Sequence, residues 1–333
     1  MAMLKSILIV LVLLTMIDMI ASIAYTCDRR APCGCSKRST VFLSKIIGGE
    51  PADQPQAWGW IASLRRNGLH ACGASLISPW FVITAAHCVQ DIESLSSLTL
   101  HFGIMDLSNQ GQIRNVTKMF VHPSFDRTLF INDLALLRLH RPLPVINANV
   151  SSICLPKVSD IDQTTTEYPP AGENLIGIGW GTTDSDVRMP SPILRQVTVQ
   201  AIGRTQTACV NSINDDVFQF CAGTADGSKD TCYGDSGGPL MMFQRGRWIL
   251  AGVTSYGSNC GVFGFAGVYT RVANYQSYIR AIINDDSSAP SDGKQLGTEK
   301  ASSSKTNTLY ASSILRTLIT CSFIVSISRL HSN

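Results

Sequence analysis

The sequence predicts an all-β fold. Between Ile46 and about Val272, short strand-like runs alternate with turn residues such as Gly, Pro, Asn and Asp, without helical crossovers. The clearest runs are Trp80–Thr84, Leu98–Phe102, Leu134–Leu139, Gln196–Ile202 and Ile249–Ser255. This pattern is typical of barrels or sandwiches, and about 240 residues exceed one small barrel. A closing helix is expected over Tyr275–Ile283, whose isoleucines share one face.

The N-terminus has the features of a secretory signal peptide. Lys5 precedes the apolar run Ile7–Ile17, and the small residues Ser22-Ile-Ala24 offer a cleavage site. We therefore expect a signal peptide over residues 1–24 and an extracellular location, reached through the secretory pathway. An uncleaved signal anchor is the alternative, which the short run and the interrupting Asp18 disfavour.

Export would place the cysteines in an oxidising compartment, where they form disulfides. The chain has 11 cysteines, of which Cys321 lies in the C-terminal tail, so ten remain for pairing. Export would also expose the sequons at Asn115 and Asn149 to N-glycosylation, although some sequons stay unused. The formal net charge of +3 is too weak and too unpatterned to indicate nucleic acid or an acidic polymer as partner.

The composition changes after Asp286. Residues 287–308 are rich in Ser, Gly, Lys and Pro and predict a disordered linker. Residues 309–333 form an apolar tail that Arg316 interrupts. Three interpretations stay open for this tail: a GPI-anchor signal with small residues at Ser302–Ser304, a transmembrane helix that Arg316 disfavours, and a dispensable extension of a secreted protein.

Three short motifs carry the chemistry. The segment Asp230-Thr-Cys-Tyr-Gly-Asp-Ser-Gly-Gly-Pro239 places Ser236 in a glycine-rich turn, where backbone N–H groups can surround its hydroxyl. Upstream, Thr84-Ala-Ala-His-Cys88 supplies His87, and Asp133 opens the run Asp-Leu-Ala-Leu-Leu-Arg. A hydroxyl becomes a strong nucleophile when a base removes its proton and an acid orients that base. Each residue alone has an ordinary structural explanation, but together they predict nucleophilic catalysis.

These motifs resemble those of the chymotrypsin/trypsin family of serine proteases. TAAHC, DLALLRL and GDSGGP match its three signature motifs, and Lys45-Ile-Ile-Gly-Gly49 matches its activation site. The resemblance runs from about Ile46 to Asn284 and implies a protease domain over residues 46–286. It further implies two six-stranded antiparallel β-barrels with the active site between them and a short C-terminal helix. His87 and Asp133 would belong to the first barrel and Ser236 to the second.

The resemblance assigns the catalytic roles. His87 would act as general base and then general acid, Asp133 would orient its imidazole, and Ser236 would attack the substrate. The backbone N–H groups of Gly234 and Ser236 would bind the oxyanion. Ser255 matches the residue that supports the catalytic Asp and begins the strand that pairs with substrate.

The resemblance also assigns the substrate pocket. Asp230 would lie at its floor and select Lys or Arg, because a buried carboxylate needs a cationic partner. Gly257 and Gly267 would line the walls without obstructing a long side chain. Tyr256 departs from the usual Trp of the family, which leaves the depth of the neighbouring subsites open. Proteins or peptides with Lys or Arg at the cleaved bond are the expected substrates, and protein protease inhibitors are expected partners.

Activation is expected to follow the family's route. Cleavage between Lys45 and Ile46 would free an ammonium group that pairs with Asp235 and forms the pocket. His70 matches the histidine that holds this aspartate in the zymogen. Because Lys45 is itself basic, the active enzyme could cleave its own precursor. Residues 25–45 form the expected propeptide.

Disulfide pairing is implied by the family as well. The expected pairs are Cys72–Cys88, Cys209–Cys221 and Cys232–Cys260. Cys154 matches the site that retains the cleaved propeptide as a light chain, through Cys27, Cys33 or Cys35. Because a bridge between Cys33 and Cys35 would be strained, we expect Cys27 to pair with one of these two.

Two other functions remain as alternatives. One is a catalytically inactive, protease-like binding module, which the presence of all the motif residues disfavours. The other is cleavage after aromatic residues, which requires that Asp230 face away from the pocket. No cofactor and no metal site are expected, because the histidines and cysteines have other roles. The acidic residues that bind calcium in some relatives are absent, since Ile104-Met-Asp106 stands in their place.

Overall fold

The structure is a computed structural model, and it confirms the all-β fold class with two closed six-stranded barrels. It describes residues 22–35, 40–43, 50–52, 57–144, 150–157, 167–182, 189–224, 233–257 and 264–287. All of these belong to the first of two units into which the chain divides, residues 1–288. The linker and tail expected over residues 287–333 lie outside the described residues, apart from Ser287 at the end of a helix.

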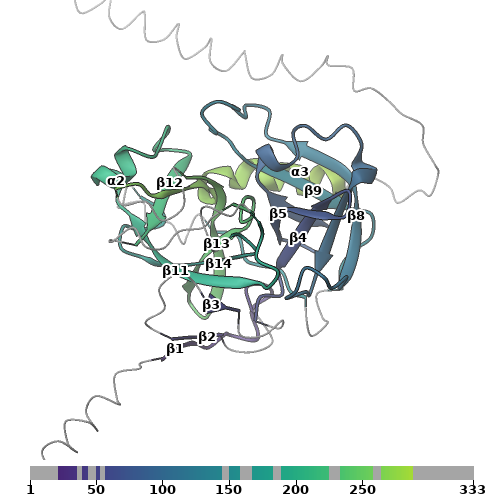
Figure 1. Cartoon of the computed structure of the whole chain (residues 1–333), viewed down its shortest axis with the longest axis horizontal. Coiled ribbons are helices and arrows are strands. Elements are labelled where there is room, and N and C mark those ends of the chain that lie inside the picture. Colours follow the sequence, from purple (N-terminus) through teal and green to yellow (C-terminus); the bar gives the residue numbers. More distant parts are fainter. Residues whose placement is uncertain are drawn as a thin grey trace, which may run out of the picture. The chain divides into compact units, whose positions relative to one another are not determined.

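The first barrel is built from six antiparallel strands of the N-terminal half of the chain (Figure 1). They are β4 (Ile61–Arg66), β5 (Leu69–Leu76), β6 (Phe81–Thr84), β7 (Leu98–Phe102), β8 (Gln112–Val121) and β9 (Ala135–Leu139). Their spatial order is β4-β5-β6-β9-β8-β7, and pairing of β7 with β4 closes the barrel. Two 3-10 helices, η1 (Ala86–Cys88) and η2 (Leu95–Ser97), lie between β6 and β7.

The second barrel uses the C-terminal half. Its strands are β10 (Asn174–Gly179), β11 (Arg195–Ile202), β12 (Gln219–Gly223), β13 (Pro239–Gln244), β14 (Arg247–Tyr256) and β15 (Gly267–Arg271). Their order is β10-β13-β14-β15-β12-β11, and β10 pairs with β11 to close the barrel. The short strand β3 (Glu50–Pro51) adds to β11, and the helix α2 (Thr207–Val210) follows β11.

Buried tryptophans join the cores of the two barrels. Trp58 and Trp60 precede β4, and their rings lie 5.8 Å apart, edge to face. The Trp58 ring also lies 5.1 Å from that of Trp248 in β14, while the Trp60 indole N–H donates to the Met241 sulfur of β13 at 2.9 Å. Aromatic rings of this size bury a large apolar area and prefer such edge contacts. The two barrels are therefore joined by a packed, buried aromatic cluster.

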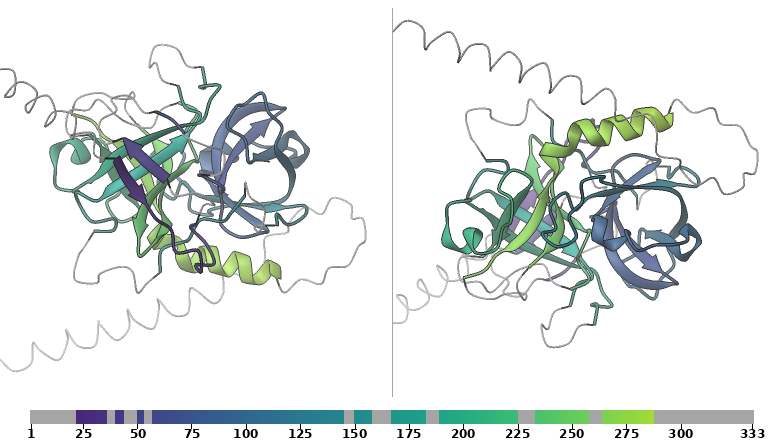
Figure 2. Two further views of the ribbon diagram at one scale, coloured as in Figure 1. Left: turned by 90° about the horizontal axis from the view of Figure 1, so that it is seen from below. Right: turned by 90° about the horizontal axis from the view of Figure 1, so that it is seen from above.

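The C-terminal helix is longer than the sequence predicts. The chain turns through η4 (Val272–Tyr275) into α3 (Gln276–Ser287), which is drawn in yellow-green (Figure 2). Asp286 forms ion pairs with Lys118 at 2.5 Å and with Arg138, which hold the last turn of α3 on β8 and β9. These long-range pairs explain why the helix continues beyond Ile283. In the part of the chain that the structure describes, no helix is both long and apolar enough to cross a membrane.

The described disulfides settle the choice that the sequence leaves open. The bonds are Cys27–Cys35, Cys33–Cys154, Cys72–Cys88 and Cys209–Cys221. The remaining cysteines Cys232, Cys260 and Cys321 lie outside the described residues. Cys33 thus ties the N-terminal segment to the body of the protein, and Cys27–Cys35 closes a small loop around that tie.

Backbone hydrogen bonds also dock the N-terminal segment. The N–H of Asp28 donates to the Gly246 carbonyl at 2.7 Å, in the turn between β13 and β14. Gly34 donates to Ser152 and accepts from Trp248, at 2.7 and 2.8 Å. A Cβ atom at position 34 would overlap the Trp248 backbone, and φ of Gly34 is +71°, so glycine is required there. Upstream, β1 (Ser22–Tyr25) pairs with β2 (Thr40–Leu43).

Candidate active site

Two neighbouring strands of the first barrel bring His87 and Asp133 together. Thr84 at the end of β6 pairs with Ala135 at the start of β9, so the residues just beyond them meet at one end of the barrel. The Asp133 carboxylate accepts from the His87 backbone N–H at 2.9 Å, and its other oxygen lies 2.7 Å from His87 Nδ1. Asp133 is fully buried, whereas the imidazole is about one-fifth exposed. The imidazole is therefore oriented at Nδ1 and partly accessible to solvent.

The second barrel supplies further contacts to Asp133. The Ser255 hydroxyl in β14 donates to the Asp133 carboxylate at 2.5 Å. The Thr270 hydroxyl in β15 donates to the Asp133 backbone carbonyl at 2.8 Å. A buried carboxylate is costly unless donors satisfy it, and here the donors come from both barrels. Thr270 is a residue that the sequence analysis missed, because nothing in the local motif points to it.

A tight turn carries Ser236 against both barrels. Gly234 and Gly237 on either side have φ of +100° and +76°, which side chains rarely permit. The Ser236 carbonyl accepts from Gly73 of β5 at 2.8 Å, and the Gly237 N–H donates to Thr254 of β14 at 2.8 Å. Next to Gly73, the Cys72–Cys88 disulfide connects β5 to the residue that follows His87. The turn is thus anchored beside the segment that carries His87.

Two hydrogen bonds fix the peptide groups that carry the N–H groups of Gly234 and Ser236. The Tyr233 carbonyl accepts from Thr182 at 2.8 Å, and the Asp235 carbonyl accepts from Gly238 at 2.8 Å. In a trans peptide, the N–H of the next residue points away from that carbonyl. The N–H groups of Gly234 and Ser236 therefore point away from the Thr182 and Gly238 N–H groups that bind these two carbonyls.

Asp235 lies within this turn, and His70 contacts the turn from β5. Asp235 accepts from the Gly181 N–H at 2.7 Å, and a Cβ atom on Gly179 or Gly181 would overlap its carboxylate. His70 Nε2 lies 3.0 Å from the Gly234 carbonyl and Nδ1 lies 2.9 Å from the Ser63 hydroxyl. Burial lowers the pKa of His70, so the neutral ring donates from Nε2 to the carbonyl. In this conformation His70 supports the turn beside Asp235.

The predicted substrate-binding residues lie at the ends of two paired strands. Ser255 is buried and Tyr256 is half-buried at the end of β14, and exposed Gly257 follows. Gly267 begins the neighbouring strand β15 and is buried. Burial raises the pKa of Tyr256 to about 12. The other predicted positions lie outside the described residues: Lys45, Ile46, Asn149, Asp230, Cys232 and Cys260.

Comparison with known proteins decides the family. A family model described as Trypsin matches residues 46–279, which is most of the chain. The chain belongs to the trypsin family of serine proteases. Its order of His, Asp and Ser motifs and its two barrels agree with this membership.

Curated relatives of this trypsin-family chain include membrane-associated proteases. Transmembrane protease serine 11C of Mus musculus is 34% identical over 74% of this chain and 55% of its own length. Transmembrane protease serine 7 of Rattus norvegicus is 35% identical over 75% of this chain and 29% of its own length. The suppressor of tumorigenicity 14 protein homolog of Bos taurus is 36% identical, again over 75% and 29%. The chain thus spans about half or less of these relatives.

One cluster in the trypsin-family site has the composition of a metal site but not its chemistry. Cys72, His87 and Cys88 have ligand atoms within 4.8 Å of one another. The two sulfurs form a disulfide, so neither is a thiolate that could bind a metal. His87 also directs Nδ1 to Asp133. We therefore assign no metal to this cluster.

Proposed function

We propose that this chain is a serine endopeptidase that cleaves proteins after Lys or Arg. The observation that supports it best is the pairing of His87 with buried Asp133, beside the Ser236 turn. His87 Nε2 would take the Ser236 proton while Oγ attacks the scissile carbonyl. The imidazolium would then protonate the leaving amine as the C–N bond breaks, and water would hydrolyse the acyl-enzyme by the same route in reverse.

The fixed peptide groups around Ser236 would stabilise the charge that develops on the substrate oxygen. The N–H groups of Gly234 and Ser236 need not reorient during the reaction, because the Tyr233 and Asp235 carbonyls are already hydrogen bonded. Removing one such donor typically costs about 2.7–4 kcal/mol of transition-state stabilisation. Specificity for basic residues rests on Asp230, by analogy with the family.

We also propose that the chain is made as a zymogen. Cleavage between Lys45 and Ile46 would release an ammonium group for Asp235, whose carboxylate lies against Gly179 and Gly181. The bond between Cys33 and Cys154 would keep residues 25–45 attached as a light chain. The relatives named transmembrane proteases favour a secreted or surface-tethered enzyme, and exposed Asn115 suits glycosylation.

The decisive experiment is hydrolysis of small ester or amide substrates after activation of the purified protein. We expect cleavage after Arg and Lys but not Phe, complete loss in Ser236→Ala, and loss of basic specificity in Asp230→Ser. Inactivity of the fully activated wild type would instead favour the binding module. A preference for Phe would show that Asp230 does not face the pocket.

Self-activation and tethering have their own tests. If the enzyme cleaves its own precursor, Ser236→Ala should remain a single chain when it is expressed alone. Complete conversion of that variant would contradict the proposal. On gels, the activated wild type should separate into two chains only after reduction of the disulfides. Release of the protein from cells by a phosphatidylinositol-specific phospholipase would identify a GPI anchor.

A further inference from the structure

A bulge in the first barrel places Arg65 opposite His70. Leu64 of β4 pairs with Cys72 of β5. The next pair is Arg65 with His70, which leaves Ala71 as an extra residue in β5. Without this bulge, Arg65 would pair with Ala71 instead. Bulges often re-aim a side chain next to an active site, and cross-strand partners share one face of a sheet. The guanidinium and the imidazole are therefore brought to the same face.

Three polar side chains form a chain of hydrogen bonds there. Arg65 Nε donates to the buried Ser63 hydroxyl at 3.4 Å, and the Ser63 oxygen lies 2.9 Å from His70 Nδ1. On the other side of the ring, His70 Nε2 lies 3.0 Å from the Gly234 carbonyl. The chain thus runs from a buried cation in β4 to the turn that carries Ser236. The sequence analysis missed Arg65, since an arginine in a strand has no distinctive pattern.

The direction of each hydrogen bond follows from the guanidinium. Because a guanidinium can only donate, the Ser63 oxygen accepts from Arg65, and the hydroxyl proton is left for His70 Nδ1. A ring nitrogen that accepts carries no proton, so the proton of the neutral imidazole lies on Nε2, where it donates to the Gly234 carbonyl. A second proton, on Nδ1, would face the hydroxyl proton. Arg65 therefore favours one tautomer of the neutral ring.

The first barrel holds this guanidinium in a fixed position. Arg65 Nη2 donates to the carbonyls of Leu107 and Asn109 at 2.7 and 3.1 Å. None of the ion pairs that the structure describes involves Arg65. Burial lowers the pKa of His70, and the charge of Arg65 lowers it further. The cation thus acts on the imidazole through both its charge and the Ser63 hydroxyl.

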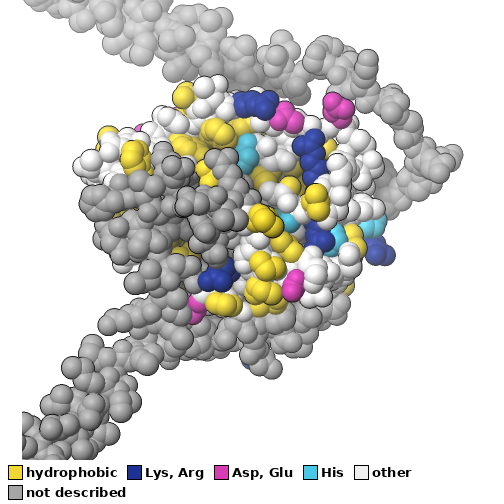
Figure 3. Space-filling model, viewed as in Figure 1, with side chains coloured by type: hydrophobic (Ala, Val, Ile, Leu, Met, Phe, Trp, Pro, Cys, Tyr) yellow, Lys and Arg dark blue, Asp and Glu magenta, His cyan; other side chains and the backbone are white. Residues whose placement is uncertain are grey.

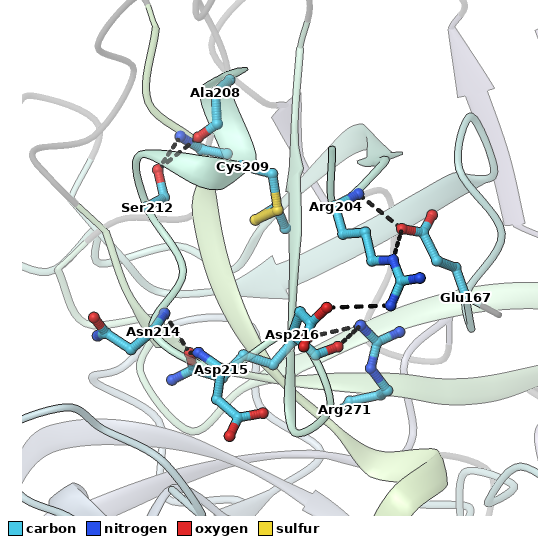
Figure 4. The surroundings of a disulfide bond; sticks show 12 residues. Glu167, Arg204, Ala208, Cys209, Ser212, Asn214, Asp215, Asp216 and Arg271 are labelled. Atoms are coloured by element: carbon cyan, nitrogen blue, oxygen red, sulfur yellow. Dashed lines mark hydrogen bonds and ion pairs between the residues drawn. A yellow bond between two sulfur atoms is a disulfide. The ribbon is translucent and has the colours of Figure 1, made fainter. Parts of the chain in front are cut away.

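Figure 4 shows the contrasting case of Arg271 in the second barrel. This buried guanidinium also donates to backbone carbonyls, among them that of Asp216 at 3.1 Å. Burial lowers the pKa of Arg271 to about 10, but the carboxylates of Glu167, Asp216 and Asp215 oppose the shift. Acidic neighbours therefore balance the charge of Arg271, whereas burial is the cause that lowers the pKa of Arg65.

We propose that Arg65 is a positioning residue, which turns the Ser63 hydroxyl toward His70 and so keeps this ring a neutral donor to the Gly234 carbonyl. For its effect on catalysis, this inference rests on the proposed function. The Gly234 carbonyl belongs to the peptide between the two that carry the proposed oxyanion donors. Of the carbonyls of residues 233–235, it is the one bound by a side chain that can change its protonation. Arg65 therefore stabilises the turn through His70.

The test follows the protons on His70 by ¹⁵N NMR of the histidine-labelled protein, in which His70→Gln identifies the signals of this ring. In the wild type, Nε2 should be protonated and Nδ1 bare. In Arg65→Met, the Ser63 hydroxyl is free to accept, so Nδ1 should gain a proton at a higher pH than in the wild type. Adding Ser63→Ala to this variant should reverse part of the change, because Nδ1 then loses its acceptor.

Arg114→Met is the matched control for the loss of a buried guanidinium. Arg114 of β8 is also buried and donates to the carbonyls of Ile113 and Pro142 at 2.9 and 3.3 Å. This variant should leave the His70 signals and kcat unchanged. If Arg65→Met leaves the His70 signals unchanged, or if Arg114→Met changes them equally, the inference is wrong.

Catalysis by the activated enzyme provides a second readout. In Arg65→Met, kcat for an Arg substrate should fall about two- to tenfold with little change in KM, the range expected from one hydrogen bond. The ratio of variant to wild-type kcat should fall further as pH is lowered, and this ratio cancels the pH dependence that both enzymes share. Ser63→Ala is a smaller change that breaks the same chain, and it should lower kcat by a similar factor.

The two readouts separate the inference from the proposed function. An unchanged kcat in both Arg65→Met and Ser63→Ala would show that the chain does not position the turn, and it would overturn the inference. If the activated wild type cleaves no Arg substrate, the proposed function fails. The NMR signals of His70 would still decide whether Arg65 sets the protons of this ring.

Discussion

Replacing Gly73 by Ala should displace the turn that carries Ser236. A Cβ atom at position 73 would lie 2.7 Å from Gly238 Cα and 3.0 Å from Gly238 N. The shorter distance is about 0.7 Å inside ordinary van der Waals contact, and both neighbours are backbone atoms that cannot rotate away. Since Gly73 also donates to the Ser236 carbonyl, the turn that holds Ser236 must move with it.

The expected loss follows from the size of that displacement. A misplacement of about 1 Å at a catalytic group can cost about 100-fold in rate. We therefore expect kcat/KM for an Arg substrate to fall about 10- to 100-fold, which is about 1.4–2.7 kcal/mol. Overpacking should also destabilise the fold by about 1–3 kcal/mol. Rates should be measured well below the melting temperature, per active site titrated.

Gly203→Ala is the matched control for this prediction. Its added Cβ would meet its nearest neighbour, the Ala171 Cβ, at 3.4 Å, which is ordinary contact. This variant should keep both its rate and its melting temperature. A Gly73→Ala enzyme with kcat/KM within twofold of the wild type would refute the reasoning that the turn has no room to yield.

Four further predictions concern stability. Asp286→Asn should lower the melting temperature by several degrees through loss of the ion pairs to Lys118 and Arg138, as measured by calorimetry. Burial alone would raise the pKa of Asp286, but these hydrogen bonds outweigh it and lower the pKa, so its contribution should disappear only as pH falls below about 4. Burial lowers the pKa of His70, so the unfolded state binds a proton at this residue more readily than the folded state. The stability of the wild type should therefore fall as pH drops below about 6.5, and it should fall less steeply in His70→Gln. Urea unfolding at several pH values would measure both effects. Buried Arg65 donates to the Leu107 and Asn109 carbonyls, so Arg65→Met should speed hydrogen exchange in that loop. Millimolar Ca²⁺ should leave the wild-type melting temperature unchanged, because Ile104-Met-Asp106 stands in place of the calcium-binding acidic residues of some relatives.

The sequence is informative where function concentrates residues in a short motif. Short strand-like runs between turn residues predict β6, β7, β9 and β11 to within one residue at each end, because β6, β7 and β9 are largely buried apolar runs and all four end at turns. The motifs likewise single out His87, Asp133 and Ser236 as the proposed catalytic residues, and two of them, His87 and Asp133, are directly paired.

The local sequence does not predict contacts between segments that are far apart in the chain. Thr270 reaches Asp133 across 137 positions, and Asn214 reaches Leu129 across 85. Nothing in the local sequence of either donor indicates its acceptor. The end of α3 is similar, because Asp286 looks like a solvent-exposed residue until its partners on β8 and β9 are known. Figure 3 adds that charges of both signs are scattered over the visible face, so charge alone locates no site there.

Because the donors to Asp133 come from both barrels, catalytic activity should depend on how closely the two barrels pack together. His87 binds this carboxylate from the first barrel and Ser255 from the second, while Thr270 holds its backbone. If the barrels separated even slightly, the carboxylate would admit water and the imidazole would lose its orientation before either barrel unfolded. Loss of activity on heating or in denaturant should therefore precede loss of β-structure, and it would measure the strength of the interface between the barrels.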